Sequence, residues 1–181
     1  MNPDRLYRLA TLLTTSGESI EDALDFVTAL EKEFFAPPIV RFRYDRDIAP
    51  NGEEPSYATE GSWGADLVAA AGAVLSPGRV TKVRTGLHIE LPEDYEAQVR
   101  PRSGLGSKGI TVINSPGTID QDYKGEVCVM LVNTTNEPYN VEVGDRIAQL
   151  VVARACRAQF RFVTELSSTA RGDKGFGSTG R

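Results

Sequence analysis

The chain has 181 residues, a formal net charge of −5, two cysteines and one histidine. This length is sufficient for a domain that folds without disulfides, and the scarcity of cysteine and histidine excludes a disulfide framework, a four-ligand zinc site and any site that needs two imidazoles. The acidic balance argues against nucleic acid as a partner, and no apolar run approaches the roughly 20 residues of a membrane helix. We therefore expect a soluble, cytoplasmic protein that binds neither nucleic acid nor membrane.

The first 37 residues are predicted to form a helical hairpin. Asn2 is a suitable cap for a first helix that ends near Gly17, and Ser19 is the expected cap of a second helix. The apolar face of this second helix would consist of Ile20, Leu24, Val27, Leu30 and Phe34. We interpret residues 1–37 as an extension that braces the main domain. A binding site for a protein partner in residues 1–35 is the alternative.

Residues 38–168 carry the pattern of short strands. Apolar and polar residues alternate over 87–91 and over 95–100, as in strands with one buried face. Residues 127–132 are apolar on both faces, which is typical of a strand inside a barrel or between subunits. Turn signals lie at 76–78, 116–117 and 144–145. Many short strands at regular spacing predict an all-β sandwich, jelly roll or barrel.

Five segments combine residue types that favour ligand binding over plain structure. They are residues 64–67, 101–106, 114–126, 144–150 and 171–181. Each has a structural explanation when taken alone, such as an Asp66 that caps a turn. The second segment follows a strand and offers Arg102, Ser103 and two glycines, a composition that suits an oxyanion although it lacks the lysine of a P-loop. If the third segment is extended in its middle, Asp120 and Asp122 share one face.

The glycine-rich end of the chain, residues 169–181, is expected to be a flexible arm. Four glycines follow Arg171, and few side chains there have anything to bury. A disordered tail is the simplest interpretation. Phe176 and Arg171 within so flexible a segment instead suggest a flap that closes on a ligand.

Taken together and in this order, the five segments resemble the five motifs of the trimeric all-β dUTPases. The most specific matches are PRSGL at 101–105, GTID at 117–120 followed by Tyr123 and Gly125, GDRIAQ at 144–149, and GFGSTG at 175–180. The resemblance covers about the last two thirds of the chain. It implies a distorted jelly-roll barrel, with the helical extension outside it and the arm closing the active site.

The resemblance also implies an activity. In that family a water attacks the α-phosphorus of dUTP and releases dUMP and pyrophosphate, which keeps uracil out of DNA. Asp120 matches the aspartate that activates the water, and Mg²⁺ is held by the triphosphate and water rather than directly by the protein. Asp66 would support the site. The matching substrate-binding residues are Arg102, Ser103, Gly104, Asn114, Gly117, Thr118, Ile119, Tyr123, Gln149, Arg171, Phe176, Gly177, Ser178 and Thr179.

Within the site, the resemblance assigns parts of the substrate to particular segments. Asn114 and the backbone after it would read uracil, and Tyr123 would pack on the deoxyribose and leave no room for a 2'-hydroxyl. Phe176 would stack on the base. The family's sites are shared between three chains, so a homotrimer is expected, and a monomer would be inactive.

Two other functions stay open at this point. A dCTP deaminase has the same fold but needs a glutamate where this chain has Met130. A nucleotide-sensing regulator that acts through the helical extension is compatible with every motif. Trp63, Ala65 and Lys174 depart from the usual dUTPase pattern.

Overall fold

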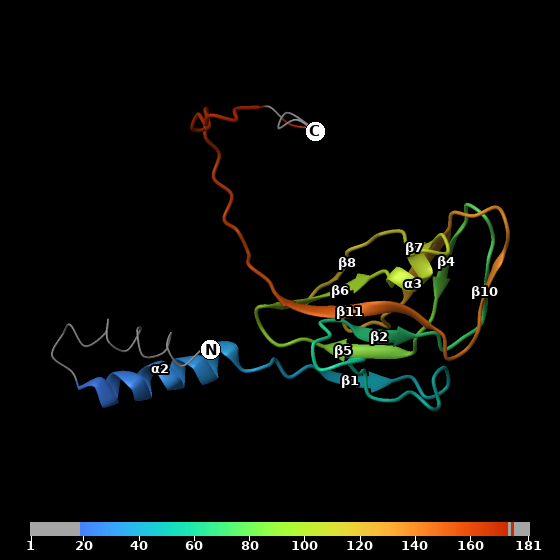
Figure 1. Cartoon of the computed structure of the whole chain (residues 1–181), viewed down its shortest axis with the longest axis horizontal. Coiled ribbons are helices and arrows are strands. Elements are labelled where there is room, and N and C mark those ends of the chain that lie inside the picture. Colours follow the sequence, from blue (N-terminus) through green and yellow to red (C-terminus); the bar gives the residue numbers. More distant parts are fainter. Residues whose placement is uncertain (1–18, 174, 176–181) are drawn as a thin grey trace.

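A computed structural model describes residues 19–173 and 175, in which short antiparallel strands form a barrel. A helix and an extended C-terminal segment both project away from the barrel, on the left in Figure 1. The all-β fold class is therefore confirmed. The elements are α2 (Ile20–Phe35), β1 (Arg41–Tyr44), β2 (Ala65–Val68), β3 (Ala73–Leu75), β4 (Val80–Val83), β5 (Leu87–Glu90), β6 (Tyr95–Arg100), α3 (Ser103–Gly106), β7 (Ile110–Val112), β8 (Gly117–Ile119), β9 (Val129–Asn133), β10 (Tyr139–Val141) and β11 (Arg146–Arg154).

The strands make four antiparallel sheets. The largest has the order β2-β11-β6-β8, and the others are β4-β9-β7, β1-β5 and β10-β3. The long strand β11 lies at the centre of the largest sheet, where it pairs with β2 at its beginning and with β6 over most of its length. This arrangement brings segments that are far apart in the sequence to neighbouring positions at one end of the sheet.

The core lies inside the barrel and confirms the predicted alternation. In β5, Leu87 and Ile89 are buried while Glu90, the last residue of the strand, is exposed. Ala97 and Val99 are the buried residues of β6. Full burial of an aliphatic side chain of this size contributes about 1.5–3 kcal/mol. In β9 most residues are buried, but Met130 is 36% exposed, so one position of this strand stays open to the outside of the single chain.

The N-terminal helix α2 begins where the cap was predicted. The Asp22 backbone N–H donates to Ser19 Oγ at 3.1 Å, and Ser19 Oγ donates to the Asp22 carboxylate at 2.7 Å. Ala23 and Val27 are buried in a small cluster separate from the barrel core, with Leu24 half-buried against them. Ile20, expected on the apolar face, is 44% exposed because it lies in the first turn.

Parts of the predicted extension lie outside the described residues. These are the first helix, residues 1–17, and the side chains of Leu30 and Phe34. The helical hairpin therefore stays a prediction. In the described part of the chain, α2 has neither the length nor the hydropathy that a membrane crossing requires.

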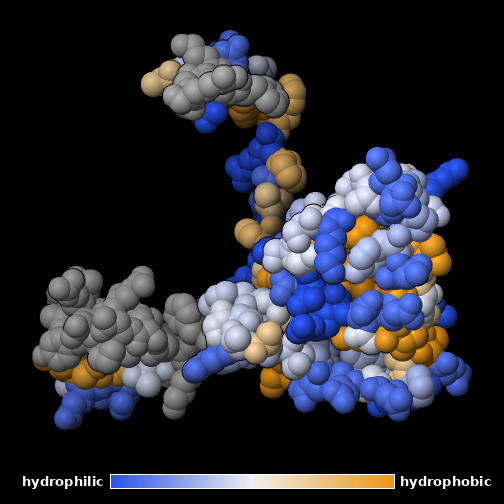
Figure 2. Space-filling view, turned by 45° about the vertical axis from the view of Figure 1, so that its right-hand side comes forward, coloured by the Kyte–Doolittle hydropathy of each residue, from blue (hydrophilic) through white to orange (hydrophobic). Residues whose placement is uncertain are grey.

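Beyond β11 the chain leaves the barrel as an exposed segment (Figure 1). Phe160 is 98% exposed, Phe162 is 94% exposed and Leu166 is 89% exposed. Figure 2 shows apolar and charged side chains along this segment, standing clear of the barrel surface. Such a run of exposed apolar side chains is unusual for a monomer and is typical of a surface that a partner covers.

Candidate active site

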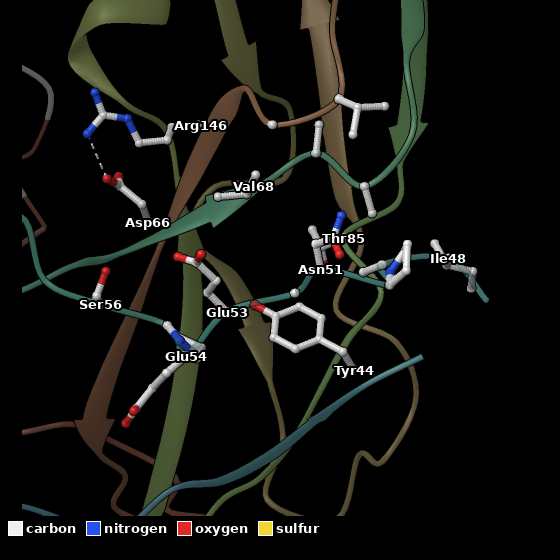
Figure 3. Close-up of a pocket in the computed structure, with 18 of the residues that line it drawn as sticks. Tyr44, Ile48, Asn51, Glu53, Glu54, Ser56, Asp66, Val68, Thr85 and Arg146 are labelled. Carbon is white, nitrogen blue, oxygen red and sulfur yellow. Dashed lines mark hydrogen bonds and ion pairs between the residues drawn. The ribbon is translucent and has the colours of Figure 1, made fainter. Parts of the chain in front are cut away.

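An ion-paired cluster joins three of the predicted segments at one end of the largest sheet. Asp66 Oδ1 lies 3.0 Å from Arg102 Nε, and Arg146 Nη1 donates to Asp66 Oδ2 at 3.2 Å. Arg102 Nη1 also donates to the Arg146 carbonyl at 3.2 Å. The Asp66 side chain is only 13% exposed, so its carboxylate holds two guanidinium groups where few waters can compete. Figure 3 shows the pair between Asp66 and Arg146.

Strand register brings the three segments that carry these residues side by side. Gln149 of β11 pairs with Asp66 of β2 on one side and with Arg100 of β6 on the other, so the side chains of Gln149, Asp66 and Arg100 share one face of the sheet. Gly64 lies directly against Gln149, and a Cβ at this position would approach the Gln149 Cβ to 3.0 Å. The close approach accounts for a glycine there. Trp63 is exposed and Ala65 is buried, and neither departure from the family pattern removes Asp66 from its place.

The PRSGL segment turns sharply after β6. Arg102 is the residue before the short helix α3, and Ser103 and Gly104 follow it with exposed positions. Arg102 itself is half-buried because its guanidinium reaches back to Asp66. The segment therefore presents a hydroxyl and backbone next to a cation that is already oriented, which is an arrangement suited to binding an anion.

The second group of predicted residues lies around β8. Gly117 is buried, and a Cβ there would come within 2.8 Å of Asn114 Nδ2, so the turn before β8 folds tightly onto its first residue. Thr118 and Asp120 are exposed, whereas Ile119 between them is buried in the core. The alternation of a strand thus directs these two polar side chains outward.

The condition for Asp120 and Asp122 to share a face is not met. Strand β8 ends at Ile119, and the Tyr123 backbone N–H donates to the Asp120 carbonyl at 3.1 Å, which closes a turn. The prediction of a shared face assumed extended backbone, and the turn removes it. Asp120 is therefore the last residue that continues the outward direction of β8.

The Tyr123 ring folds back over the residues that follow it. Its hydroxyl donates to the Glu126 carbonyl at 2.9 Å, and a Cβ at Gly125 would overlap the ring. The glycine at 125 is therefore a steric requirement of the tyrosine position. The ring itself remains 46% exposed and so is accessible to a ligand or to another chain.

A single chain does not bring Asp120 to the ion-paired cluster. Ile119 pairs with Ala97 near the start of β6, whereas Arg102 lies beyond the other end of the same strand. The five steps from Ala97 to Arg102 would span about 17 Å if the chain stayed extended throughout, and β6 itself ends at Arg100. Of the arm residues, Arg171 is exposed, and Phe176, Gly177, Ser178 and Thr179 lie outside the described residues.

A contact that the sequence analysis did not anticipate joins Glu126 to Arg84. Burial raises the pKa of the Glu126 carboxyl, but hydrogen bonds from Arg84 and from the Gly86 and Thr85 amides outweigh it, so the pKa lies below its usual value. The same interaction raises the pKa of Arg84. The only signal in the sequence was an acidic residue at the end of the third segment, and its partner is 42 residues away.

A cavity of about 860 Å³ adjoins the ion-paired cluster. It lies between the loop that follows β1 and the edge of β2, and Asp66 and Arg146 form part of its wall. Figure 3 shows Tyr44 and Glu53 facing the same space from the other side. Burial raises the pKa of Tyr44, and the opposing effect of Arg46 is smaller. This cavity could not be predicted from sequence patterns, because the loop that borders it is polar and irregular.

The chain is similar to known proteins over the segments that form this site. The dUTPase family model matches residues 51–180. The chain is 53% identical over 131 residues to the deoxyuridine 5'-triphosphate nucleotidohydrolase of Ehrlichia canis, covering 70% of this chain and 86% of the relative. It is 49% identical over 146 residues to the enzyme of the same name from Anaeromyxobacter, covering 80% of this chain and 99% of the relative.

A solved structure agrees with these relatives. The dUTPase of Staphylococcus bacteriophage 80alpha with dUPNHPP superimposes with a TM-score of 0.70 and 26% sequence identity, over 79% of this chain and 99% of that one. Phage dUTPases are described there as controlling the transfer of virulence genes by a mechanism like that of a proto-oncogenic G protein. The chain therefore belongs to the dUTPase family, whose members are dUTP diphosphatases.

Proposed function

We propose that this protein hydrolyses dUTP to dUMP and pyrophosphate by in-line attack of a water on the α-phosphorus, and that it serves nucleotide metabolism by keeping uracil out of DNA. The observation that carries the proposal is the dUTPase match over residues 51–180, which includes the cluster of Asp66, Arg102 and Arg146.

Arg102, Ser103, Gly104 and Gln149 are proposed to bind the phosphate chain. The guanidinium of Arg102 is held by Asp66 at 3.0 Å, so it is oriented before the substrate arrives. A charged donor fixed in advance binds phosphate oxygens without a further loss of side-chain entropy. Gln149 lies on the same sheet face as Asp66, next to this cation.

Asp120 is proposed to orient the attacking water and to accept its proton. Asp120 directly follows β8, in which Gly117 and Ile119 are buried, so the backbone that carries its exposed carboxylate is anchored to the core. A positioned base contributes about 10²- to 10⁴-fold to such a reaction. Transfer of the water's proton to a carboxylate oxygen of Asp120 leaves a hydroxide aimed at phosphorus.

Mg²⁺ is the expected cofactor. In the stretch that the structure describes, no three His, Cys, Asp or Glu side chains come together in a way that could hold a metal ion. The ion would thus be held by phosphate oxygens and water, as Mg²⁺ commonly is, and it would neutralise charge on the triphosphate. The oriented Arg102 would add to that neutralisation from the protein side.

Asn114, Gly117, Thr118 and Ile119 are proposed to read uracil, with the backbone of β8 offering donors and acceptors to the edge of the base. Tyr123 would cover the deoxyribose with its exposed ring. Since the ring is held by a hydrogen bond to the Glu126 carbonyl, it could not move aside easily for a 2'-hydroxyl.

The active unit is proposed to be a homotrimer with shared sites. Asp120 follows a residue that pairs near the start of β6, whereas Arg102 lies beyond the other end of that strand, and this arrangement supports a site that takes the two residues from different chains. The exposed side chains of Met130, Phe160 and Phe162 also favour a partner copy that covers them.

The C-terminal arm is proposed to close over the bound nucleotide with Arg171, Phe176, Gly177, Ser178 and Thr179. Deleting the chain after Ala170 should leave the melting temperature unchanged, because every buried residue of the barrel core lies before that point. Hydrolysis should fall to a small fraction of the full-length rate. A truncated protein with full activity would contradict the proposed closure.

The direct test is to incubate the purified protein with dUTP, UTP or dCTP in the presence of Mg²⁺ and to assay pyrophosphate and ammonia. Pyrophosphate from dUTP, with little from UTP or dCTP, is the expected result. Ammonia from dCTP would indicate the deaminase reaction instead. Tight binding of dUTP without turnover would indicate a sensor.

A second candidate is a nucleotide-dependent regulator that binds a protein partner through residues 1–35. The exposed apolar side chains of Ile20 and Phe26 in α2 favour this, as does the regulatory mechanism attributed to the related phage dUTPases. Deleting residues 1–35 should leave kcat and KM for dUTP near their full-length values, since α2 contributes nothing to the barrel core. A large loss of kcat on deletion would instead assign the extension to catalysis.

A further inference from the structure

Glu126, at the end of the third motif, is attached to the turn between β4 and β5. Its Oε1 accepts the Gly86 N–H at 2.8 Å and the Thr85 N–H at 3.2 Å. Its Oε2 accepts from Arg84 Nε at 2.8 Å and lies 2.8 Å from Arg84 Nη2. The Glu126 side chain is only 14% exposed. Every lone-pair direction that a carboxylate normally uses is thus taken by a donor from one short turn.

This turn is itself firmly anchored. Thr85 is 3% exposed, and its hydroxyl accepts the Leu87 N–H at 3.1 Å while donating to the Val127 carbonyl. The Asp45 N–H donates to the Gly86 carbonyl at 2.8 Å. Gly86 has a φ of +67°, and a Cβ there would approach the Ala49 Cβ to 2.8 Å. Glu126 is therefore attached to a part of the core, not to a mobile loop.

The backbone carbonyl of Glu126 holds the Tyr123 ring in its position. The tyrosine hydroxyl donates to the Glu126 carbonyl at 2.9 Å, and the ring covers Gly125. His88 Nδ1 is 3.0 Å from the Lys124 carbonyl and provides a second connection between β5 and this loop. The position of the ring thus depends on residues 124–126. These residues are attached to the barrel by the Glu126 carboxylate, by His88 and by the Val127 N–H, which donates to the Leu87 carbonyl at 2.8 Å.

We propose that Glu126 is a positioning residue for sugar discrimination: its carboxylate fixes the loop that holds the Tyr123 ring against the 2' position of the nucleotide. The inference rests on the proposed dUTP hydrolysis and on the proposed packing of Tyr123 against deoxyribose. Without the carboxylate, the loop loses its bonds to the Arg84 side chain and to the Thr85 and Gly86 amides and keeps only its backbone pairing with β5, so the ring gains freedom to move aside. A ribonucleotide then fits better, while the phosphate-binding cluster around Asp66 is unaffected.

The test compares kcat/KM for dUTP with kcat/KM for UTP in Glu126→Ala, Glu126→Gln and Arg84→Met. The ratio of the two values is expected to fall about tenfold in Glu126→Ala, because charged hydrogen bonds of this kind are lost. The ratio should fall less in Glu126→Gln, which keeps one acceptor oxygen, and in Arg84→Met, which keeps the two amide donors. The ratio is independent of how much of each preparation is folded.

Glu90→Gln is the matched control. Glu90 pairs with Arg41 at 3.4 Å on β5, so the variant removes a carboxylate from an ion pair without touching the loop. Its ratio should equal that of the wild type. Should Glu126→Ala fail to fold, Glu126→Gln and Arg84→Met decide the matter, and wild-type ratios in both would overturn the proposal. Wild-type protein that does not hydrolyse dUTP would contradict the proposed function instead.

Discussion

The two halves of the candidate site are built in different ways. The half proposed to bind phosphate joins Asp66, Arg102 and Arg146 from distant segments through ion pairs across a sheet. The half proposed to face base and sugar comes from one local stretch, residues 114–126, shaped by turns and glycines. The first half is therefore fixed by strand register, whereas the second depends on the attachment of its loop to the barrel.

This difference separates binding from chemistry. Ion pairs that are formed before the substrate arrives favour binding of the ground state and the transition state alike. A base at the end of a strand contributes only when the water reacts. Substitutions in the two halves should accordingly change different kinetic constants.

The largest effect is expected at the base. Asp120→Asn should lower kcat about 10²- to 10⁴-fold because the amide cannot accept the proton, while dUTP binding measured by calorimetry should persist. Asp122→Asn is the control, since Asp122 is an exposed neighbour in the same turn and should keep wild-type activity. Near-normal turnover by Asp120→Asn would place the base elsewhere.

A smaller effect is expected in the phosphate-binding half. Arg102→Gln should lower kcat/KM about 100-fold, since it removes a charged phosphate donor and leaves Asp66 with Arg146 alone. Arg102→Lys should lie between this variant and the wild type, because lysine keeps the charge without the planar geometry. Equal activity of all three proteins would contradict a role for Arg102 at the phosphates.

The smallest effect concerns stability in acid. Because the folded pKa of Glu126 is lowered, its carboxylate stabilises the protein above the unfolded value of 4.5, and this contribution is lost as the pH falls through the folded pKa. The wild type should therefore melt higher than Glu126→Gln near neutral pH. Below the folded pKa the two melting temperatures should converge. A constant difference at every pH would contradict the ionised network with Arg84.

The strands and the cap were predictable because they depend on local patterns. Alternation at Leu87 and Ile89 requires only that one face is buried, and Ser19 caps α2 through an amide three residues away. Strand β1 was not identified, since Arg41, Phe42 and Arg43 are all exposed and give no contrast between faces. Its pairing with β5 is a tertiary contact.

The site was predictable only through the motifs. Taken by itself in the sequence, Asp66 is explained as a residue that caps a turn. Its partners Arg102 and Arg146 become apparent only from the register of β2 and β11 and from the ion pairs. The attachment of Glu126 to Arg84 also joins residues far apart in sequence. Local periodicity carries no information on such pairs, so the structure was needed to find them.

The central claim is that Asp120 and Arg102 of one site belong to different chains. It is tested most directly by refolding Asp120→Asn and Arg102→Gln together and assaying dUTP hydrolysis. Each variant alone should be nearly inactive, yet random mixing in a trimer with shared sites should restore about one quarter of the wild-type activity. A mixture that stays as inactive as its two components would show that both residues act within the same chain.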